Sequence, residues 1–494
     1  MKDKIWNWLK NYQNQILLII LLFAFIIRLK YFNINSAIWW DEGDYLSYAR
    51  RLAFDIPTKD LWYYRRVFFM PLVWAFLYKL GFQELGLRIV QLLFSFTGVI
   101  GAYLLTKEMF DKKTALITSL LMSAYWVHLF FTARLLTDVP AVTLATFGLY
   151  FFWKGYIKKE KQSNIILAGI FLGLALFTKL STLFYMIPIG LLILTKEKLK
   201  FIKNKNLWII GIIIFIIMLP FVITVFNYYP ENPITSFIGH YTGIKVLPGS
   251  EDVTPRTFTQ VIQQFKDLTY HLKYPLLILL LLSLTYFIDL ILGADLIFKE
   301  QGLQKRFFIL ASIVIPTAIF GYIRFYIEQR DLMLVMIFIF MLISVTTLKL
   351  YELIKQKNKT LAIVSLIVIL IIAIYPQVIF ADNLINEKKD SYLQVKEASE
   401  WLKQNSNPND LIITYSTVQT TYYTDLNVTS ISSEEEILTL KPRYFIISLY
   451  EQHRDWYLQY PFKHQDIMIP VQAYYLNNDQ PSLVIFEVKN VPNN

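Results

Sequence analysis

Long apolar runs recur along the first 380 residues and are separated by short polar stretches. A helix rises about 1.5 Å per residue, so roughly 20 mostly apolar residues cross about 30 Å of hydrocarbon. This pattern predicts a mainly α-helical, polytopic membrane protein. About eleven runs are candidate membrane spans, at residues 16–28, 90–105, 115–131, 139–153, 165–177, 180–194, 207–226, 275–297, 308–323, 332–348 and 361–380.

Three segments depart from the pattern of simple spans. Residues 31–88 mix aromatic and charged side chains, as an interfacial amphipathic helix would. Residues 227–273 are rich in proline and glycine, and from residue 381 onward the composition becomes that of a soluble domain. We therefore predict a membrane domain over residues 1–380, with outer loops at about 31–88 and 227–273, and a separate domain over residues 381–494.

The segment 381–494 contains both helical and strand patterns. One helix is predicted from its periodicity, and short β-branched and aromatic runs predict strands. We expect a small α/β domain. Its predicted helix is 396–405, and its predicted strands are 411–414, 444–448 and 482–487.

The composition supports lipid as the solvent. Hydrophobic residues make up 55% of the chain and charged residues only 17%, whereas soluble proteins keep about a quarter of their residues charged. No cysteine is present, which excludes disulfides, thiolate metal sites and cysteine nucleophiles. The first apolar run lacks a small-residue cleavage site, so we predict a retained helix.

The net charge of +11 would suit a nucleic-acid partner, but its distribution indicates a membrane. Most lysines lie in short clusters between apolar runs, which is typical of cytoplasmic loops. An N-terminus in the cytoplasm puts the lysine-rich connections inside and, with an odd number of spans, the C-terminal domain outside. We expect no nucleic-acid partner. The inside clusters are Lys107, Lys112 and Lys113; Lys154, Lys158, Lys159 and Lys161; Lys196, Lys198, Lys200, Lys203 and Lys205; Lys299, Lys305 and Arg306; and Lys349, Lys355, Lys357 and Lys359.

Charged side chains also gather at the predicted outer ends of the helices. A charge near the hydrocarbon costs several kcal/mol unless it faces water or a partner. A transporter would place such residues near mid-membrane, within broken helices. A ring at one face instead favours chemistry at the outer leaflet. The ring consists of Asp41, Glu42, Asp44, Glu84, Arg88, Arg134, Asp138, Lys179, Arg324, Glu328 and Arg330.

Two adjacent carboxylates, Asp41 and Glu42, follow the first apolar run. Trp39 and Trp40 before them suit the headgroup level. Carboxylates at a helix start can cap backbone N–H groups. Alternatively, one can act as a general base while its neighbour binds a metal or orients the acceptor. We favour the catalytic interpretation, because two acids are more than one cap needs.

An Asp-Glu pair in the first outer loop of a multi-span chain resembles the GT-C glycosyltransferases. The group it resembles comprises the dolichyl-phosphate-mannose protein mannosyltransferases and the aminoarabinose transferases. The resemblance covers about residues 15–380. Asp331 departs from it, because the family usually has Tyr there. Four further motifs are similar and in the expected order: Glu84-Leu-Gly-Leu-Arg88, Arg134-Leu-Leu-Thr-Asp138-Val-Pro140, Gly173-Leu-Ala-Leu-Phe-Thr-Lys179 and Glu328-Gln-Arg330.

The resemblance implies a sugar donor on a polyprenyl phosphate of dolichyl or undecaprenyl type, and inversion at the anomeric carbon. Asp41 would be the general base and Glu42 would position the acceptor or tune Asp41. The phosphate needs fixed cations, although each candidate could instead be an interfacial anchor. The expected phosphate ligands are Arg330, Lys179, Arg134 and Arg88, and the expected acceptor or cavity residues are Asp44, Glu84, Asp138 and Glu328.

A divalent metal ion is an open question, because some relatives bind one and others need none. By resemblance its ligands would be Asp41, Glu84 and a later histidine. His240 or His271 in the predicted outer loop could serve. A lone histidine in a loop is more often simply solvated.

We therefore predict a glycosyltransferase in the cell membrane, or in an ER-type membrane, that acts at the extracytoplasmic face. Its partners would be a polyprenyl-phosphate-linked sugar, membrane lipids, and a protein, lipid or glycan acceptor. Two alternatives use the same charged ring differently. One is a transporter or flippase of lipid-linked sugars, and the other is a scaffold whose tail binds a partner.

Overall fold

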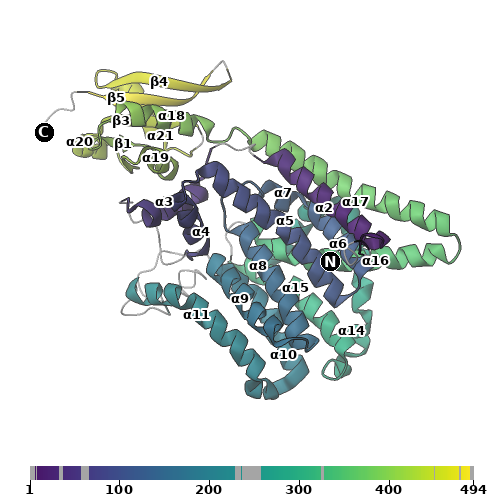
Figure 1. The fold of residues 1–494 in the computed structure, drawn as a ribbon. Coiled ribbons are helices and arrows are strands. Elements are labelled where there is room, and N and C mark those ends of the chain that lie inside the picture. The colour runs from purple at the N-terminus through teal and green to yellow at the C-terminus, as the bar shows by residue number, and fades with distance from the viewer. Residues whose placement is uncertain are drawn as a thin grey trace. The chain divides into compact units, whose positions relative to one another are not determined.

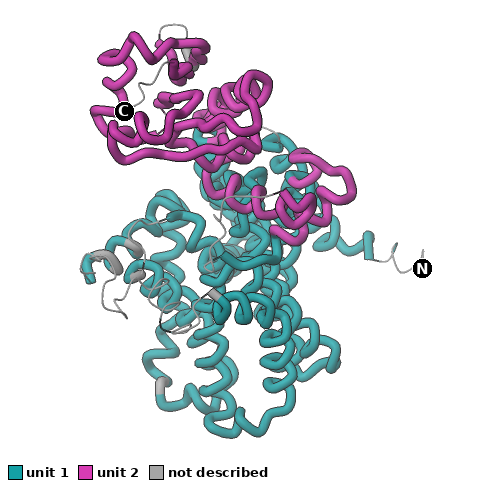
Figure 2. The backbone as a smooth tube through the Cα atoms, turned by 90° about the vertical axis from the view of Figure 1, so that its left-hand side faces the viewer, with its two compact units in different colours: residues 1–32, 63–70, 88–384 teal, residues 33–62, 71–87, 385–494 magenta. Residues whose placement is uncertain are grey.

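The computed structural model describes residues 6, 8–32, 37–56, 66–228, 235, 258–323, 328–449, 451–477 and 480–489. Their contacts form two compact units, which Figure 2 shows in teal and magenta. Unit 1 comprises Met1–Phe32, Tyr63–Met70 and Arg88–Leu384. Unit 2 comprises Asn33–Trp62, Pro71–Leu87 and Ile385–Asn494. These units are groupings by contact, and the division at residues 380 and 381 stays a prediction.

Unit 1 is helical (Figure 1). Its helices, some of which extend into unit 2, are α2 (Tyr12–Tyr31), α5 (Glu84–Met109), α6 (Lys112–Ala124), α7 (Trp126–Phe130), α8 (Asp138–Phe152), α9 (Gln162–Thr178), α10 (Leu183–Glu197), α11 (Lys205–Tyr228), α13 (Phe258–Ser283), α14 (Ile288–Leu292), α15 (Gln301–Ile323), α16 (Met333–Lys355) and α17 (Lys359–Lys388). Short turns extend several of them: η1 (Trp153–Ile157), η2 (Leu180–Thr182), η3 (Lys198–Lys203), η4 (Leu284–Phe287), η5 (Ala294–Leu296) and η6 (Gln329–Leu332).

Each apolar run predicted from the sequence lies on helical structure. Among the residues that the structure describes, eight helical stretches are long and apolar enough to cross a membrane. The predicted runs 115–131, 139–153 and 165–177 lie on shorter helices. Tyr125 is extended between α6 and α7, α8 changes to the π-helical turn η1 after Phe152, and Lys179 is extended after α9. The chain is thus a mainly helical, multi-pass integral membrane protein, while the count of eleven spans and the orientation stay predictions.

The end of the second predicted outer loop is helical, because α13 begins at Phe258. Its buried side chains Leu268, His271, Leu272 and Leu276 recur at helical spacing. The rest of that predicted loop, residues 229–234 and 236–257, lies outside the described residues.

Close helix packing in unit 1 depends on small residues. A Cβ atom added at Gly148 of α8 would lie 2.7 Å from Cδ2 of Leu172 on α9. Hydrophobicity does not drive association of helices in lipid, so such close contact and the dispersion it allows hold them together. Of the candidate spans that the structure describes, α16 is the most enclosed, because most of its side chains are buried.

Unit 2 contains a five-stranded sheet of order β2-β1-β3-β5-β4. Its strands are β1 (Leu411–Ile413), β2 (Asn427–Thr429), β3 (Tyr444–Ser448), β4 (Met468–Asn477) and β5 (Gln480–Val488). β1 pairs in parallel with β2 and β3, whereas β5 pairs antiparallel with β3 and β4. The small α/β domain is therefore confirmed, as a mixed sheet.

Helices cover both faces of this sheet. Successive strand side chains point to opposite faces. Tyr444 and Ile446 of β3 pack with α18 (Leu393–Asn405). Phe445 packs on the other face with Ile437 and Tyr457, which lie on α20 (Glu435–Leu440) and α21 (Asp455–Lys463).

Unit 2 also contains two helices from the first predicted outer loop. They are α3 (Trp40–Phe54) and most of α4 (Phe69–Lys79). α3 packs against α19 (Thr417–Thr424) of the sheet domain. The contact is close, because a Cβ atom at Gly43 would lie 2.7 Å from Cγ1 of Val418. Residues far apart in sequence thus form one unit.

Candidate active site

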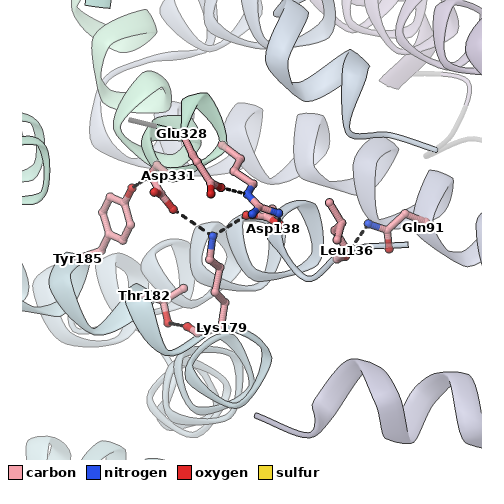
Figure 3. Close-up of polar contacts among 9 residues, drawn as sticks. Gln91, Leu136, Asp138, Lys179, Thr182, Tyr185, Glu328 and Asp331 are labelled. Atoms are coloured by element: carbon pink, nitrogen blue, oxygen red, sulfur yellow. Dashed lines mark hydrogen bonds and ion pairs between the residues drawn. The ribbon is translucent and has the colours of Figure 1, made fainter. Parts of the chain in front are cut away.

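Lys179 is the centre of a cluster of charged side chains in unit 1. Its Nζ lies 2.5 Å from Oδ1 of Asp138 and 3.2 Å from Oδ1 of Asp331. Figure 3 shows Lys179 between these two carboxylates. The side chains of Asp138 and Asp331 are 3% and 1% exposed, that of Lys179 19%. Low exposure strengthens these charge-assisted hydrogen bonds.

Local structure explains why these three residues meet. Asp138 is the first residue of α8, Lys179 follows the last residue of α9, and Asp331 lies on the turn before α16. An acidic side chain at a helix start is stabilised by the helix dipole. The extended backbone of Lys179 (φ −152°, ψ 118°) ends α9.

Arg330 and Glu328 complete the cluster. Nη1 of Arg330 lies 3.7 Å from Oδ2 of Asp138, and Nε donates a short hydrogen bond to Glu328. Four residues predicted for the site, Asp138, Lys179, Glu328 and Arg330, are thus in contact with one another. Arg324, which was also predicted in the ring, lies outside the described residues.

Asp331 and Tyr185 belong to this cluster but were not predicted as site residues. The hydroxyl of Tyr185 donates a hydrogen bond of 2.5 Å to the backbone carbonyl of Asp331. Asp331 was noted only as a departure from the family motif. An acidic residue at the start of an apolar run was the available signal, whereas nothing local to Tyr185 distinguishes it from other membrane tyrosines.

α5 positions the segment that leads into Asp138. Nη1 of Arg88 donates a hydrogen bond of 2.6 Å to the carbonyl of Ala133. Gln91, one turn further along, donates one of 2.9 Å to the carbonyl of Leu136 (Figure 3). Arg134, which lies between Ala133 and Leu136 in the chain, is fully buried. Its guanidinium lies 5.8 Å from the centre of the Phe130 ring. In the structure Arg88 contacts protein backbone, and the roles of Arg88 and Arg134 as phosphate ligands stay predictions.

The acidic pair lies in unit 2, at the start of α3. The carboxylate of Glu42 accepts a hydrogen bond of 2.7 Å from the backbone N–H of Trp39, and Glu42 is fully buried. Glu42 therefore caps the helix. Asp41 is half-buried and Asp44 is buried. The capping interpretation accounts for Glu42 but not for Asp41.

Glu84, also in unit 2, lies at one end of a chain of hydrogen bonds that includes two tyrosines. Tyr422 donates a hydrogen bond of 3.2 Å to Oε1 of Glu84, and its hydroxyl lies 3.0 Å from that of Tyr78. Burial raises the pKa of Tyr422 well above its usual value, and Tyr78 and Glu84 add to the rise. Tyr422 therefore remains a neutral donor. It was not predicted, because it is distant in sequence from Glu84.

The second predicted outer loop contains two histidines that are candidate metal ligands, and the structure describes only one of them. His240 lies outside the described residues. His271 is buried in α13, where its Nδ1 lies 2.7 Å from the hydroxyl of Tyr125. Within the described ranges, no group of three or more His, Asp or Glu side chains is placed to hold a metal ion.

Comparisons with known proteins test the predicted resemblance. Residues 67–223 match the dolichyl-phosphate-mannose-protein mannosyltransferase family. That segment includes Glu84, Arg88, Arg134, Asp138 and Lys179. No curated protein matches the chain by sequence.

Solved structures show the same fold. The chain is similar to ArnT from Cupriavidus metallidurans in the apo state, with a TM-score of 0.64 and 11% identity over 96% of this chain and 98% of ArnT. The form of ArnT bound to undecaprenyl phosphate gives a TM-score of 0.63 at 11% identity, over 97% of this chain and 99% of that one. The Archaeoglobus fulgidus oligosaccharyltransferase gives 0.61 at 13% identity, over 90% and 70%.

The family match and the fold similarity agree with the ordered motifs in the sequence. The predicted recognition and the predicted enzyme class are both confirmed. The chain is a membrane glycosyltransferase that is similar over residues 67–223 to the dolichyl-phosphate-mannose-protein mannosyltransferases.

Proposed function

We propose that this glycosyltransferase transfers a sugar from a polyprenyl-phosphate carrier to an acceptor hydroxyl at the extracytoplasmic face, with inversion and with Asp41 as general base. The observation that carries the proposal is the Lys179 cluster, which gathers two cations at helix ends in a family of lipid-phosphate sugar transferases. The undecaprenyl phosphate bound to ArnT supports a carrier of this chemistry.

The reaction is a single displacement. The acceptor oxygen forms a bond to the anomeric carbon while the bond from that carbon to the carrier phosphate oxygen breaks. The phosphate takes the electron pair, and Asp41 takes the acceptor proton. Positioned general bases contribute about 10²–10⁴-fold to rate. Glu42 caps the helix through the backbone N–H of Trp39. We therefore assign the proton transfer to Asp41, the half-buried carboxylate beside it.

Lys179 and Arg330 suit the leaving phosphate. An ammonium has three donors, and two of those on Lys179 point to Asp138 and Asp331. These carboxylates hold the side chain in place, so that its positive charge is fixed where a phosphate can be attracted to it. Fixed cations stabilise developing charge without reorganising. Glu328, at 37% side-chain exposure, is the most exposed carboxylate of the cluster, so a phosphate would displace it from Arg330 most easily.

Transfer in reconstituted vesicles tests this proposal. Proteoliposomes receive radiolabelled polyprenyl-phosphate sugars together with membrane lipids and proteins as acceptors. Wild type should release polyprenyl phosphate and label an acceptor. Asp41→Asn should lower the rate by about 10²–10⁴-fold.

Asp55→Asn is the matched control, because Asp55 is the exposed C-cap of the same helix. Its φ of 55° is one that asparagine also adopts. The control should keep the wild-type rate. If Asp41→Asn also keeps it, the assignment of the base is wrong.

A further inference from the structure

A polar cavity of about 820 Å³ lies in unit 1 among helix ends. Lys158, Lys159, Lys196 and Lys305 line it, together with Glu108 and Glu160. Its lysines therefore outnumber its carboxylates. The cavity also has an apolar wall, to which Trp153 and Leu192 belong.

The carboxylates of the cavity are already engaged. Glu108 pairs with Lys158 at 2.6 Å, and Glu160 pairs with Lys154 at 3.3 Å. Lys196 and Lys305 instead donate to the backbone carbonyls of Ile157, at 3.3 Å, and Met109, at 3.1 Å. Neither lysine forms a salt bridge with any residue that the structure describes. Their charge is therefore available to an anion.

This cavity lies far from the Lys179 cluster along the same helices. α8 with its π-helical turn runs from Asp138, in the cluster, to Ile157, in the cavity wall. Twenty helical residues rise about 30 Å, the thickness of the hydrocarbon layer. α10 likewise leads from the neighbourhood of Lys179 to Lys196. The cavity and the cluster thus lie at opposite ends of these helices.

We infer that this cavity binds the phosphate headgroup of an anionic phospholipid in the leaflet at the lysine-rich helix ends. Lys196 and Lys305 provide charge for the phosphodiester, and each lysine near a membrane surface adds to attraction for anionic lipid. The apolar wall and the exposed side chains Leu194 and Phe298 nearby in the chain suit the acyl portion. These apolar surfaces favour a lipid over a soluble phosphate ester. The site is independent of the proposed reaction.

Lipid retention tests the inference. The protein is placed in phosphatidylcholine nanodiscs with and without phosphatidylglycerol, and native mass spectrometry counts phosphatidylglycerol molecules that stay bound. The double variant Lys196→Gln/Lys305→Gln should retain phosphatidylglycerol on the order of tenfold or more weakly than wild type. The control Lys200→Gln/Lys203→Gln removes the same charge from the exposed turn η3 and should retain it as wild type does.

Three results would overturn the inference. One is equal retention by both double variants. Another is loss of retention in Lys196→Arg/Lys305→Arg, which keeps the charge, while its melting temperature in phosphatidylcholine discs stays that of wild type. The third is displacement of the bound lipid by glycerol phosphate, which would assign the cavity to soluble phosphate esters.

Discussion

Lys179, just after α9, donates a 2.5 Å hydrogen bond to Asp138, the first residue of α8. Asp331, on the turn before α16, accepts a second bond from the same ammonium. Three helix ends are therefore tied together by one cation. This arrangement makes Lys179 both a structural link and the proposed partner of the carrier phosphate.

Loss of the Lys179 charge should affect stability and activity together. Lys179→Gln removes the cation that binds both buried carboxylates and leaves Arg330 as the remaining cation near Asp138. Breaking such buried pairs costs about 3–5 kcal/mol. Transfer should fall by about 10²–10³-fold, as for loss of one group that stabilises a developing oxyanion. Thermal unfolding in detergent and the vesicle transfer assay measure the two effects.

Adding Asp138→Asn to Lys179→Gln separates the effect on stability from the effect on transfer. The second substitution removes the charge of one of the two carboxylates that Lys179 had bound, so part of the lost stability should return. The transfer rate should stay low, because the cation is still absent. A double variant that recovers activity would show that Lys179 has no role at the phosphate.

Replacing Glu42 should affect stability more than chemistry. Its carboxylate caps α3 through the N–H of Trp39, and loss of such a cap costs about 0.5–2 kcal/mol. Glu42→Ala should therefore lower the melting temperature. At a temperature where the variant is folded, its transfer rate should stay within a few-fold of wild type. A rate as low as that of Asp41→Asn would instead assign Glu42 to the reaction.

Gly43 provides a test of how α3 packs on α19. Gly43→Ala places a methyl group 2.7 Å from Cγ1 of Val418, and overpacking of this kind costs about 1–3 kcal/mol. Val418→Ala removes the clashing atoms. In a double-mutant cycle followed by thermal unfolding, Gly43→Ala should be less destabilising in the Val418→Ala background. Equal effects in both backgrounds would contradict the contact.

Tyr422→Phe removes the donor that binds Glu84 inside unit 2. Tyr78 and Glu84 would lose a buried partner, which costs about 1–3 kcal/mol. Tyr423→Phe is a useful comparison, because Tyr423 is the next residue and its hydroxyl accepts from the N–H of Ile38 instead. The stability lost in each tyrosine variant is compared with and without Glu84→Gln in a double-mutant cycle. Coupling to Glu84→Gln is expected for Tyr422→Phe only.

Two glutamates of unit 2 should respond to pH with opposite sign. Burial raises the pKa of Glu451, although a hydrogen bond from Ser416 opposes the rise. Its contribution to stability is therefore present below the unfolded pKa, about 4.3, and is lost as pH rises through the folded pKa. Glu451→Gln should raise the melting temperature more at neutral pH than in acid.

Glu436 is the matched case. Hydrogen bonds from Ser432 lower its pKa, so its contribution is present above the unfolded pKa and is lost as pH falls through the folded one. Glu436→Gln should thus lower the melting temperature at neutral pH and have less effect in acid. Parallel pH profiles for the two variants would contradict these assignments.

The sequence by itself determined the helices and the class of enzyme. Apolar runs of membrane-spanning length dictate helices, since in lipid every backbone polar group must be bonded within its own segment. Strand 444–448 was also predicted with the bounds that β3 has in the structure. Ordered motifs such as the one from Arg134 to Pro140 carried the family resemblance, because they are local in the chain.

Only the tertiary structure decided which charges meet. It placed Asp331 beside Lys179 and Tyr185 beside Asp331. It also joined the carboxylate of Glu42 to the backbone N–H of Trp39 by a hydrogen bond. It also formed β2, which the sequence did not predict because its three residues, Asn427–Thr429, include a single apolar side chain. The physical reason is common to all of these. Pairing energy depends on distance in space, and residues separated by 41 or 152 positions carry no sign in the sequence that their side chains will lie within bonding distance.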